Sequence, residues 1–271
     1  MRISLSKVEQ EAPELVAAFK QTKISLSKHS NMRDHVARVA LVLDISASMS
    51  GLYRSGLVDR LVSKALPVGL SFDDDGEIDL FAFGVGAYEM DGCNMANYRG
   101  AASGILAKHS LEGGTYYARA LELLEEKYAD STDPVFVIFV TDGETAEQEN
   151  VTKMIRKLSK LPIFLQFVGL GEQLLPPGFD GSEAPVVSQK PGFLARLFGA
   201  SVTQSANGGS TRSSGFKYLQ QLDEMSGRVV DNCNFFSLKD PASVDDELLY
   251  DLLMNEYPSW VKEAKAKGIL R

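Results

Sequence analysis

Apolar runs alternate with amphipathic segments along most of the chain. Short, mostly apolar runs predict buried strands, at residues 39–43, 78–83, 135–140, 163–168 and 235–238. Longer segments with apolar side chains at helical spacing predict helices, at residues 54–69, 96–108, 115–129, 145–160 and 242–256. A strand that is apolar on both faces is typical of a sheet covered by helices on both sides. The alternation therefore predicts an α/β fold with a doubly wound, mainly parallel, Rossmann-like sheet.

The N-terminal segment departs from this alternation. Apolar positions at 8–20 predict one helix, and the pentapeptide Ile-Ser-Leu-Ser-Lys flanks it twice, at 3–7 and 24–28. We expect the two copies to form short extended edges on either side of the helix. The chain then divides into a helical and extended N-terminal extension, an α/β domain and a C-terminal tail, at residues 1–36, 37–256 and 257–271.

An insertion at residues 172–214 interrupts the α/β domain. It is rich in Pro, Gly, Ser and Gln and lacks sustained periodicity, so we expect a mobile loop that proteases cut first. Within it, residues 193–198 (Phe-Leu-Ala-Arg-Leu-Phe) form one or two amphipathic turns. Such turns suit a membrane surface or a partner, but their shortness favours packing against their own domain.

The composition is that of a globular protein and excludes several functions. The 271 residues carry a net charge of −8, which lacks the basic footprint of a nucleic-acid-binding protein. The two cysteines, Cys93 and Cys233, fit neither a zinc site nor a disulfide framework. The N-terminus lacks the apolar core of a signal peptide, and no run of about 18 apolar residues predicts a transmembrane helix. We therefore expect a cytoplasmic protein.

Three oxygen-bearing side chains follow the first buried strand at alternate positions: Asp44, Ser46 and Ser48. On a loop that turns into a helix, this spacing lets one carboxylate and two hydroxyls converge on one point. Ligands of doubly wound sheets bind at the carboxyl ends of the strands. Hard oxygen donors suit Mg²⁺, Ca²⁺ or Mn²⁺ rather than zinc or copper.

Two further segments bring candidate ligands to the same edge. Thr115 follows Gly113 and Gly114 at the predicted start of a helix, and Asp142 follows the second apolar strand. Because parallel strands end at one edge of the sheet, we expect both side chains beside Asp44, which itself should lie near solvent. Each residue alone fits a helix cap or a turn. The order of all five along the elements favours a metal site.

The order Asp44-x-Ser46-x-Ser48, then Thr115, then Asp142 resembles the metal-ion-dependent adhesion site of von Willebrand factor A domains. The resemblance covers residues 37–256 in element order, apart from the insertion. It departs where Ala47 stands in place of the family's usual glycine, although neither residue offers a ligand. The resemblance implies that the serines and the threonine contact the ion and that the aspartates act directly or through water. It also implies one open coordination position, which an acidic residue of a partner can fill.

Further motifs are similar to a narrower group, the A-domain proteins of bacterial tellurium (toxic-cation) resistance clusters. Besides the run that begins at Asp44 and the doubled Ile-Ser-Leu-Ser-Lys, they are Phe72-Asp-Asp-Asp-Gly76, Leu111-Glu-Gly-Gly-Thr-Tyr-Tyr117, Val229-Val-Asp-Asn232, Glu247-Leu-Leu-Tyr-Asp251 and Glu256-Tyr-Pro-Ser-Trp260. This resemblance implies a divalent-metal-dependent protein-interaction module in tellurium resistance or a stress response. The implied cofactor is Mg²⁺, or else Ca²⁺ or Mn²⁺, and the implied partner is a protein that offers an acidic residue.

Other functions stay open on the sequence. Glu144, Gly114 and Tyr116 flank the expected ligands and are weaker candidates for partner contacts. Glu144 is also a candidate general acid or base for a metal-assisted hydrolase. No GxSxG, Walker A or dinucleotide motif is present, so a binding module ranks above an enzyme. A third hypothesis is a peripheral membrane adaptor that uses residues 193–198 and the ion.

Overall fold

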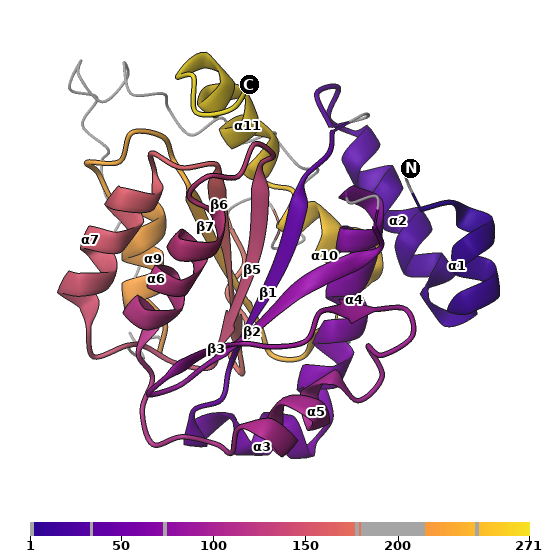
Figure 1. Cartoon of the computed structure of the whole chain (residues 1–271), viewed down its shortest axis with the longest axis horizontal. Coiled ribbons are helices and arrows are strands. Elements are labelled where there is room, and N and C mark those ends of the chain that lie inside the picture. The colour runs from indigo at the N-terminus through magenta and orange to yellow at the C-terminus, as the bar shows by residue number, and fades with distance from the viewer. Residues whose placement is uncertain (1–2, 33–34, 73–74, 177–178, 180–214, 242–243) are drawn as a thin grey trace, which may run out of the picture.

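The computed structural model describes residues 3–32, 35–72, 75–176, 179, 215–241 and 244–271. Most of the predicted insertion, including the amphipathic turns at 193–198, lies outside the described residues, so the expectations for it stay predictions. Within the described ranges the strands form a seven-stranded sheet with helices on both faces (Figure 1). This arrangement confirms the predicted α/β fold class.

The sheet is mainly parallel. Its strands are β1 (Arg38–Asp44), β2 (Glu77–Phe83), β3 (Ala87–Glu89), β4 (Cys93–Asn94), β5 (Val135–Thr141), β6 (Ile163–Leu170) and β7 (Cys233–Leu238). Their order is β3-β2-β1-β5-β6-β7, and β4 also pairs with β2. Only β3 and β4 run antiparallel to their neighbour among these strands. The apolar strands β1 and β5 pair directly, with Leu43 opposite Val140, so the loops that follow them leave the same edge.

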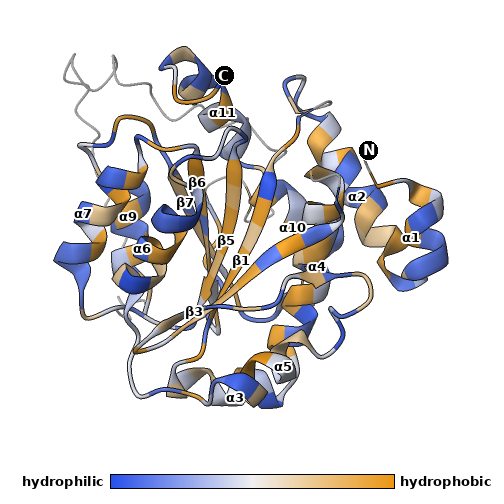
Figure 2. Cartoon of the chain, viewed as in Figure 1, coloured by the Kyte–Doolittle hydropathy of each residue, from blue (hydrophilic) through white to orange (hydrophobic). Residues whose placement is uncertain are grey.

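Alternate side chains of each strand pack against two separate layers of helices. The helices are α1 (Leu5–Glu11), α2 (Val16–Ser27), α3 (Ser50–Arg54), α4 (Leu57–Phe72), α5 (Ala101–Lys108), α6 (Tyr117–Tyr128), α7 (Gln148–Leu158), α9 (Lys217–Glu224), α10 (Asp246–Leu253) and α11 (Tyr257–Ala266). Helices α6, α7 and α9 pack against one face of the sheet. Helices α4, α10 and α11 pack against the other face, and α1 and α2 lie outside them. Figure 2 shows the apolar strands between amphipathic helices whose polar sides point outward.

The N-terminal segment is helical throughout its ordered elements, and the extended edges expected at 3–7 and 24–28 are wrong. The first copy of the pentapeptide starts α1, where the Ser4 hydroxyl caps the helix by accepting from the Lys7 amide (3.2 Å). The second copy forms the last turn of α2, with Lys28 as the C-cap. Phe19 and Leu26 of α2 are buried against the core shared by α4 and α10. Burial, rather than strand pairing, explains Ile3 and Leu26 of the repeat, whereas its other two apolar side chains, Leu5 and Ile24, are exposed.

The residues expected to form a C-terminal tail instead complete the core. Tyr257 and Trp260 of α11 are fully buried or nearly so, and their rings lie 5.5 Å apart. Phe136 of β5 and Phe164 of β6 contact the Tyr257 ring, with centroids 4.7 and 5.4 Å away. The helix begins with Pro258 in its first turn, a position that proline favours. Removing α11 would therefore uncover aromatic side chains of two central strands.

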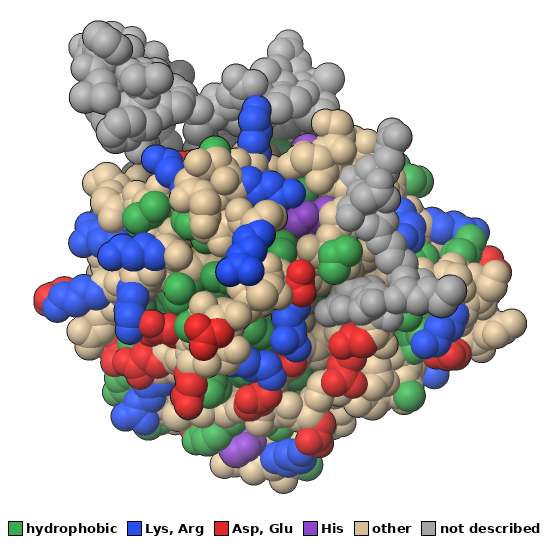
Figure 3. Space-filling view, turned by 45° about the horizontal axis from the view of Figure 1, so that its top comes forward, with side chains coloured by type: hydrophobic (Ala, Val, Ile, Leu, Met, Phe, Trp, Pro, Cys, Tyr) green, Lys and Arg blue, Asp and Glu red, His purple; other side chains and the backbone are tan. Residues whose placement is uncertain are grey.

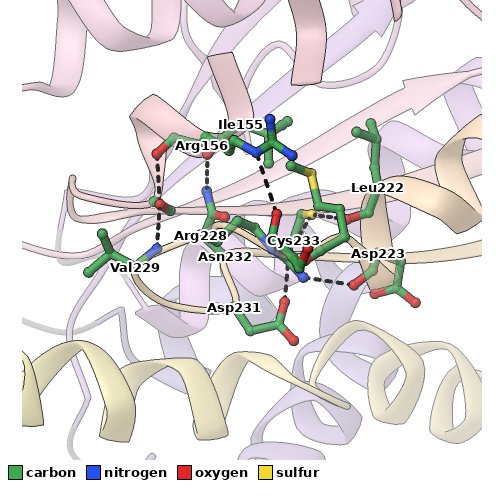
Figure 4. A network of polar contacts seen from close by, with 12 residues as sticks. Ile155, Arg156, Leu222, Asp223, Arg228, Val229, Asp231, Asn232 and Cys233 are labelled. Carbon is green, nitrogen blue, oxygen red and sulfur yellow. Dashed lines mark hydrogen bonds and ion pairs between the residues drawn. The ribbon is translucent and has the colours of Figure 1, made fainter. Parts of the chain in front are cut away.

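A buried cation fixes the turn between α9 and β7 (Figure 4). The Arg228 side chain is 6% exposed and pairs with Asp231 at 2.6 Å. It also donates to the Asp223 carbonyl and to Cys233 Sγ, both at 2.9 Å. Burial raises the pKa of the Cys233 thiol, although the nearby Arg228 opposes this effect. The Val229–Asn232 motif thus has a structural explanation in this turn.

None of the helices in the described ranges is long and apolar enough to cross a membrane.

Candidate functional site

The candidate ligands gather where β1 and β5 end. Asp44 is the last residue of β1, and Asp142 directly follows Thr141, the last residue of β5. After β1 the chain passes through a 3₁₀ turn, η2 (Ala47–Met49), which carries Ser48 to the rim of the sheet. Parallel pairing of the two strands therefore brings together residues that are almost a hundred positions apart.

Asp44 is fully buried, which corrects the expectation that it lies near solvent. Its Oδ1 accepts from the Ser46 amide (2.6 Å), and its Oδ2 accepts from the Thr141 hydroxyl (2.6 Å). Burial raises the pKa of Asp44 to about 6, and the negative charge of Asp142 adds to this shift, while the hydrogen bonds oppose it. A carboxylate that is costly to bury is stabilised by a cation close by. The position of Asp44 therefore favours a bound positive charge.

Three oxygens form a continuous row beside Asp44. Ser46 Oγ and Ser48 Oγ lie 3.0 Å apart, and the Ser48 hydroxyl donates to Asp142 Oδ1 at 2.8 Å. Burial raises the pKa of Asp142 too, against the hydrogen bond from Ser48. Ser46 is buried, Asp142 is half-buried and Ser48 is exposed, so the row leads from the core to solvent.

The loop that carries Thr115 is hydrogen-bonded to residues 45–48, which follow β1 and which we call the serine loop. The Glu112 amide donates to the Ile45 carbonyl (2.8 Å), and the Ala47 amide donates to the Glu112 carbonyl (2.7 Å), so Glu112 pairs with Ser46 as an isolated parallel bridge. The carbonyl of Thr115 accepts from the Thr145 hydroxyl (2.9 Å). Within the described ranges, no hydrogen bond joins the Thr115 hydroxyl to the other four predicted ligands. Thr115 thus lies on an adjoining loop that is tied to the site through the backbone.

Helix capping does not explain these hydroxyls. Ser46 stands at the N-cap of η2, but its side chain makes no capping hydrogen bond. Helix α6 begins at Tyr117 with Tyr116 as its N-cap, so Thr115 precedes the cap position. The interpretation of these side chains as helix N-caps is therefore wrong for Ser46 and Thr115.

The donor set fits a divalent cation of the hard type. Neighbouring oxygen ligands of an ion with six ligands at about 2.1 Å lie about 3.0 Å apart. The spacings in the row, 3.0 Å between the serine oxygens and 2.8 Å from Ser48 to Asp142, match this value. The described residues hold no group of three or more His, Cys, Asp and Glu side chains suited to a metal. A site here would therefore depend on hydroxyls in addition to two carboxylates.

The weaker candidates have other partners. Glu144 Oε1 accepts from the Tyr218 amide (2.7 Å) in the first turn of α9, so this carboxylate caps a helix. That contact disfavours Glu144 as the general acid or base of a hydrolase. Gly114 and Tyr116 are half-buried beside Thr115, and a Cβ added to Gly114 would lie 2.6 Å from Tyr116 Cε2. These two residues therefore pack against each other at the rim.

Sequence reasoning missed the residues that hold the ligands in place. Thr141 donates to Asp44, and the Tyr117 hydroxyl donates to the Gly143 carbonyl and lies 3.2 Å from Thr141 Oγ1. The Glu112 carboxylate accepts from the Gly86 amide (2.9 Å), the Tyr88 hydroxyl (2.6 Å) and the Val85 amide. The sequence offered one indication of such a residue, because Thr141 is a polar side chain at the end of an apolar strand next to Asp142.

Comparison with known proteins identifies the family. The model of the vWA-TerF-like family, the vWA found in the TerF C terminus, matches residues 36–176 and 209–270. The uncharacterized protein YcbR of Bacillus subtilis (strain 168) is 30% identical over 258 residues, which cover 93% of this chain and 88% of YcbR.

Solved structures are more distant. BatB from Bacteroides thetaiotaomicron has a TM-score of 0.43 at 17% identity and covers 84% of this chain and 99% of its own. Proximal thread matrix protein 1 from the mussel byssus, with a zinc-occupied MIDAS motif, has a TM-score of 0.36 at 20% identity and covers 51% and 36%. The family match extends over most of the chain and includes all five predicted ligands. The chain therefore belongs to the von Willebrand factor A domains of the kind found at the C terminus of TerF.

Proposed function

We propose that the chain is a divalent-cation-dependent protein-interaction module, with Mg²⁺ as the expected ion and Ca²⁺ or Mn²⁺ as alternatives. The observation that carries the proposal is the row of oxygens from Ser46 through Ser48 to Asp142, spaced like neighbouring ligands of one ion and backed by the buried Asp44. Membership of the von Willebrand factor A family supports it.

Each predicted ligand has a distinct part in this proposal. Ser46, Ser48 and Thr115 would offer neutral hydroxyls, and Asp44 and Asp142 would act directly or through water. A bound ion would supply an electrophilic, partly open coordination sphere. Because neutral donors offset little of its charge, it would still attract a carboxylate from a partner. Recognition would then require both the ion and an acidic residue on the partner.

The proposed setting is the bacterial cytoplasm, in tellurium (toxic-cation) resistance or a stress response. The TerF-type family match and the similarity to a Bacillus protein support this setting. The net charge of −8 agrees with a protein partner rather than a nucleic acid. Figure 3, which turns the edge of the sheet opposite the proposed site toward the viewer, also shows Asp and Glu among Lys and Arg.

Titration calorimetry with Mg²⁺, Mn²⁺ and Ca²⁺ tests the ion site. Ser48→Ala and Asp142→Ala should each weaken binding by tenfold or more, because each removes one oxygen from the row. Ser103→Ala removes an exposed serine hydroxyl of α5 that donates to the carbonyl of Gly100, the N-cap residue of that helix, and it should leave the affinity unchanged. Wild-type affinity in both site variants would reject the site.

Recovery of partners tests the interaction. Proteins captured from lysate of the source cell in Mg²⁺ should differ from those captured with excess chelator. Identical sets in the two conditions would reject a metal-bridged contact, even if calorimetry detects an ion.

A further inference from the structure

An exposed apolar side chain lies at the same edge of the sheet as the candidate ion site. Val85 follows β2 directly and is 42% exposed. The other large apolar side chains with such exposure in the described residues are Leu5, Ile24, Val36 and Val229. Leu5 and Ile24 belong to α1 and α2, and Val36 and Val229 precede β1 and β7, so these four lie away from the carboxyl edge. Of these five exposed apolar side chains, Val85 is thus the one at the carboxyl edge of the sheet.

Val85 packs into a continuous surface with the loop that carries Thr115. A Cβ added to Gly114 would lie 3.2 Å from Val85 Cγ2 and 2.6 Å from Tyr116 Cε2, so the glycine lets both side chains close over the loop. The Tyr116 amide donates to the Gly84 carbonyl (2.9 Å), which joins the two loops through the backbone. We call this surface, made of Val85, Gly114 and Tyr116, the apolar rim.

Glu112 fixes the apolar rim to the serine loop. Its backbone bonds with Ile45 and Ala47 flank Ser46, while its side chain accepts from the amides of Val85 and Gly86. Burial disfavours the Glu112 carboxylate, but the hydrogen bonds from Tyr88, Gly86 and Val85 outweigh this effect and lower its pKa. One residue therefore links the serine loop to the apolar rim through both its backbone and its side chain.

We propose that the partner presents an acidic residue with an apolar side chain next to it, the carboxylate meeting the ion and the apolar side chain covering Val85 and Tyr116. This inference rests on the proposed function. A carboxylate alone would select partners weakly, since acidic side chains are common on protein surfaces. An adjacent apolar contact adds affinity and restricts the partners that fit.

Selection from a displayed library of random peptides with a fixed central aspartate tests the inference on the full chain. In Mg²⁺, wild-type protein should enrich apolar residues at positions neighbouring the aspartate, and chelator should abolish the enrichment. A synthetic peptide from this pool should bind Val85→Ser about tenfold more weakly than wild type, because a buried valine contact is lost. Val229→Ser is the matched control, since Val229 is also 42% exposed, and it should bind normally.

The outcomes separate this inference from the proposed function. If the enriched peptides show no apolar preference, or if Val85→Ser binds them as wild type does, the apolar rim is not part of recognition. If calorimetry detects the ion but no peptide is enriched in Mg²⁺, the inference is rejected and the ion site stands. If no ion binds, both are rejected.

Discussion

Asp44 makes the proposed ion site sensitive to pH. Because burial raises its pKa to about 6, the ion-free carboxylate takes up a proton in mildly acidic solution. A cation binds the ionised form, so protons compete with it. We expect the affinity for Mg²⁺ to be constant above about pH 7 and to fall about tenfold per pH unit below about pH 6. Calorimetry at several pH values checks this expectation, and an affinity that stays level down to pH 4.5 would contradict it.

Glu112 should stabilise the turn after β2 independently of any ion. Glu112→Ala leaves two amides and one tyrosine hydroxyl without their acceptor, a loss of about 1–3 kcal/mol. Urea unfolding should show the lower stability, and the amides of Val85 and Gly86 should exchange faster with solvent. Glu126→Ala, at an exposed position of α6, is the control and should change neither measurement.

The close approach of four of the candidate ligands could be predicted because it depends on local order. Asp44, Ser46, Ser48 and Asp142 follow apolar strands, and parallel strands end at one edge. The contact of Thr141 with Asp44 depends on which strands are neighbours, across 97 positions, and a single sequence does not show that pairing. The burial of the Asp44 side chain could not be predicted for the same reason, since the loops that cover it come from distant parts of the chain.

At the scale of elements, α9 depends on a cap from outside its own segment. Its N-cap residue, Phe216, has no side-chain acceptor, and the Glu144 carboxylate accepts from the Tyr218 amide instead. Glu144→Ala should therefore destabilise the protein by about 1 kcal/mol, as loss of a helix cap does. Denaturant unfolding measures this cost, and calorimetry should find the ion affinity within about twofold of wild type. A large loss of ion affinity would make Glu144 part of the site.

The elements that were predicted wrongly have physical reasons of their own. The Ile-Ser-Leu-Ser-Lys copies alternate apolar and polar residues as a strand does, yet both are short and lie beside good helix-forming segments. Ser4 starts a helix at the first copy, and burial of Leu26 retains the second in α2. Helix α9 was missed because its eight residues adjoin the irregular insertion, where periodicity gives no clear boundary.

At the scale of the whole molecule, both ends of the chain cover one face of the sheet. Helices α1, α2 and α11 share a single core with α4 and α10, while the proposed ion site lies at the strand ends beside α3 (Figure 1). Lys28 at the end of α2 pairs with Glu247 (3.0 Å) and Asp251 (2.6 Å) of α10. These pairs are partly exposed and contribute little. Apolar burial therefore holds the N-terminal helices in place.

A cavity in α2 should consequently destabilise the whole fold and not the N-terminal segment alone. Phe19 is 1% exposed within the shared core, and Phe19→Ala should cost about 3–5 kcal/mol. Trp260 of α11 is the single tryptophan and is buried, so its fluorescence reports on a helix far from α2 in sequence. In the variant, the unfolding midpoints from Trp260 fluorescence and from far-ultraviolet circular dichroism should both fall, and by the same amount. Ile24→Ala, at a position 50% exposed on the same helix, should leave both within error of wild type. An unchanged Trp260 transition in Phe19→Ala would mean that residues 1–36 fold as a separate extension.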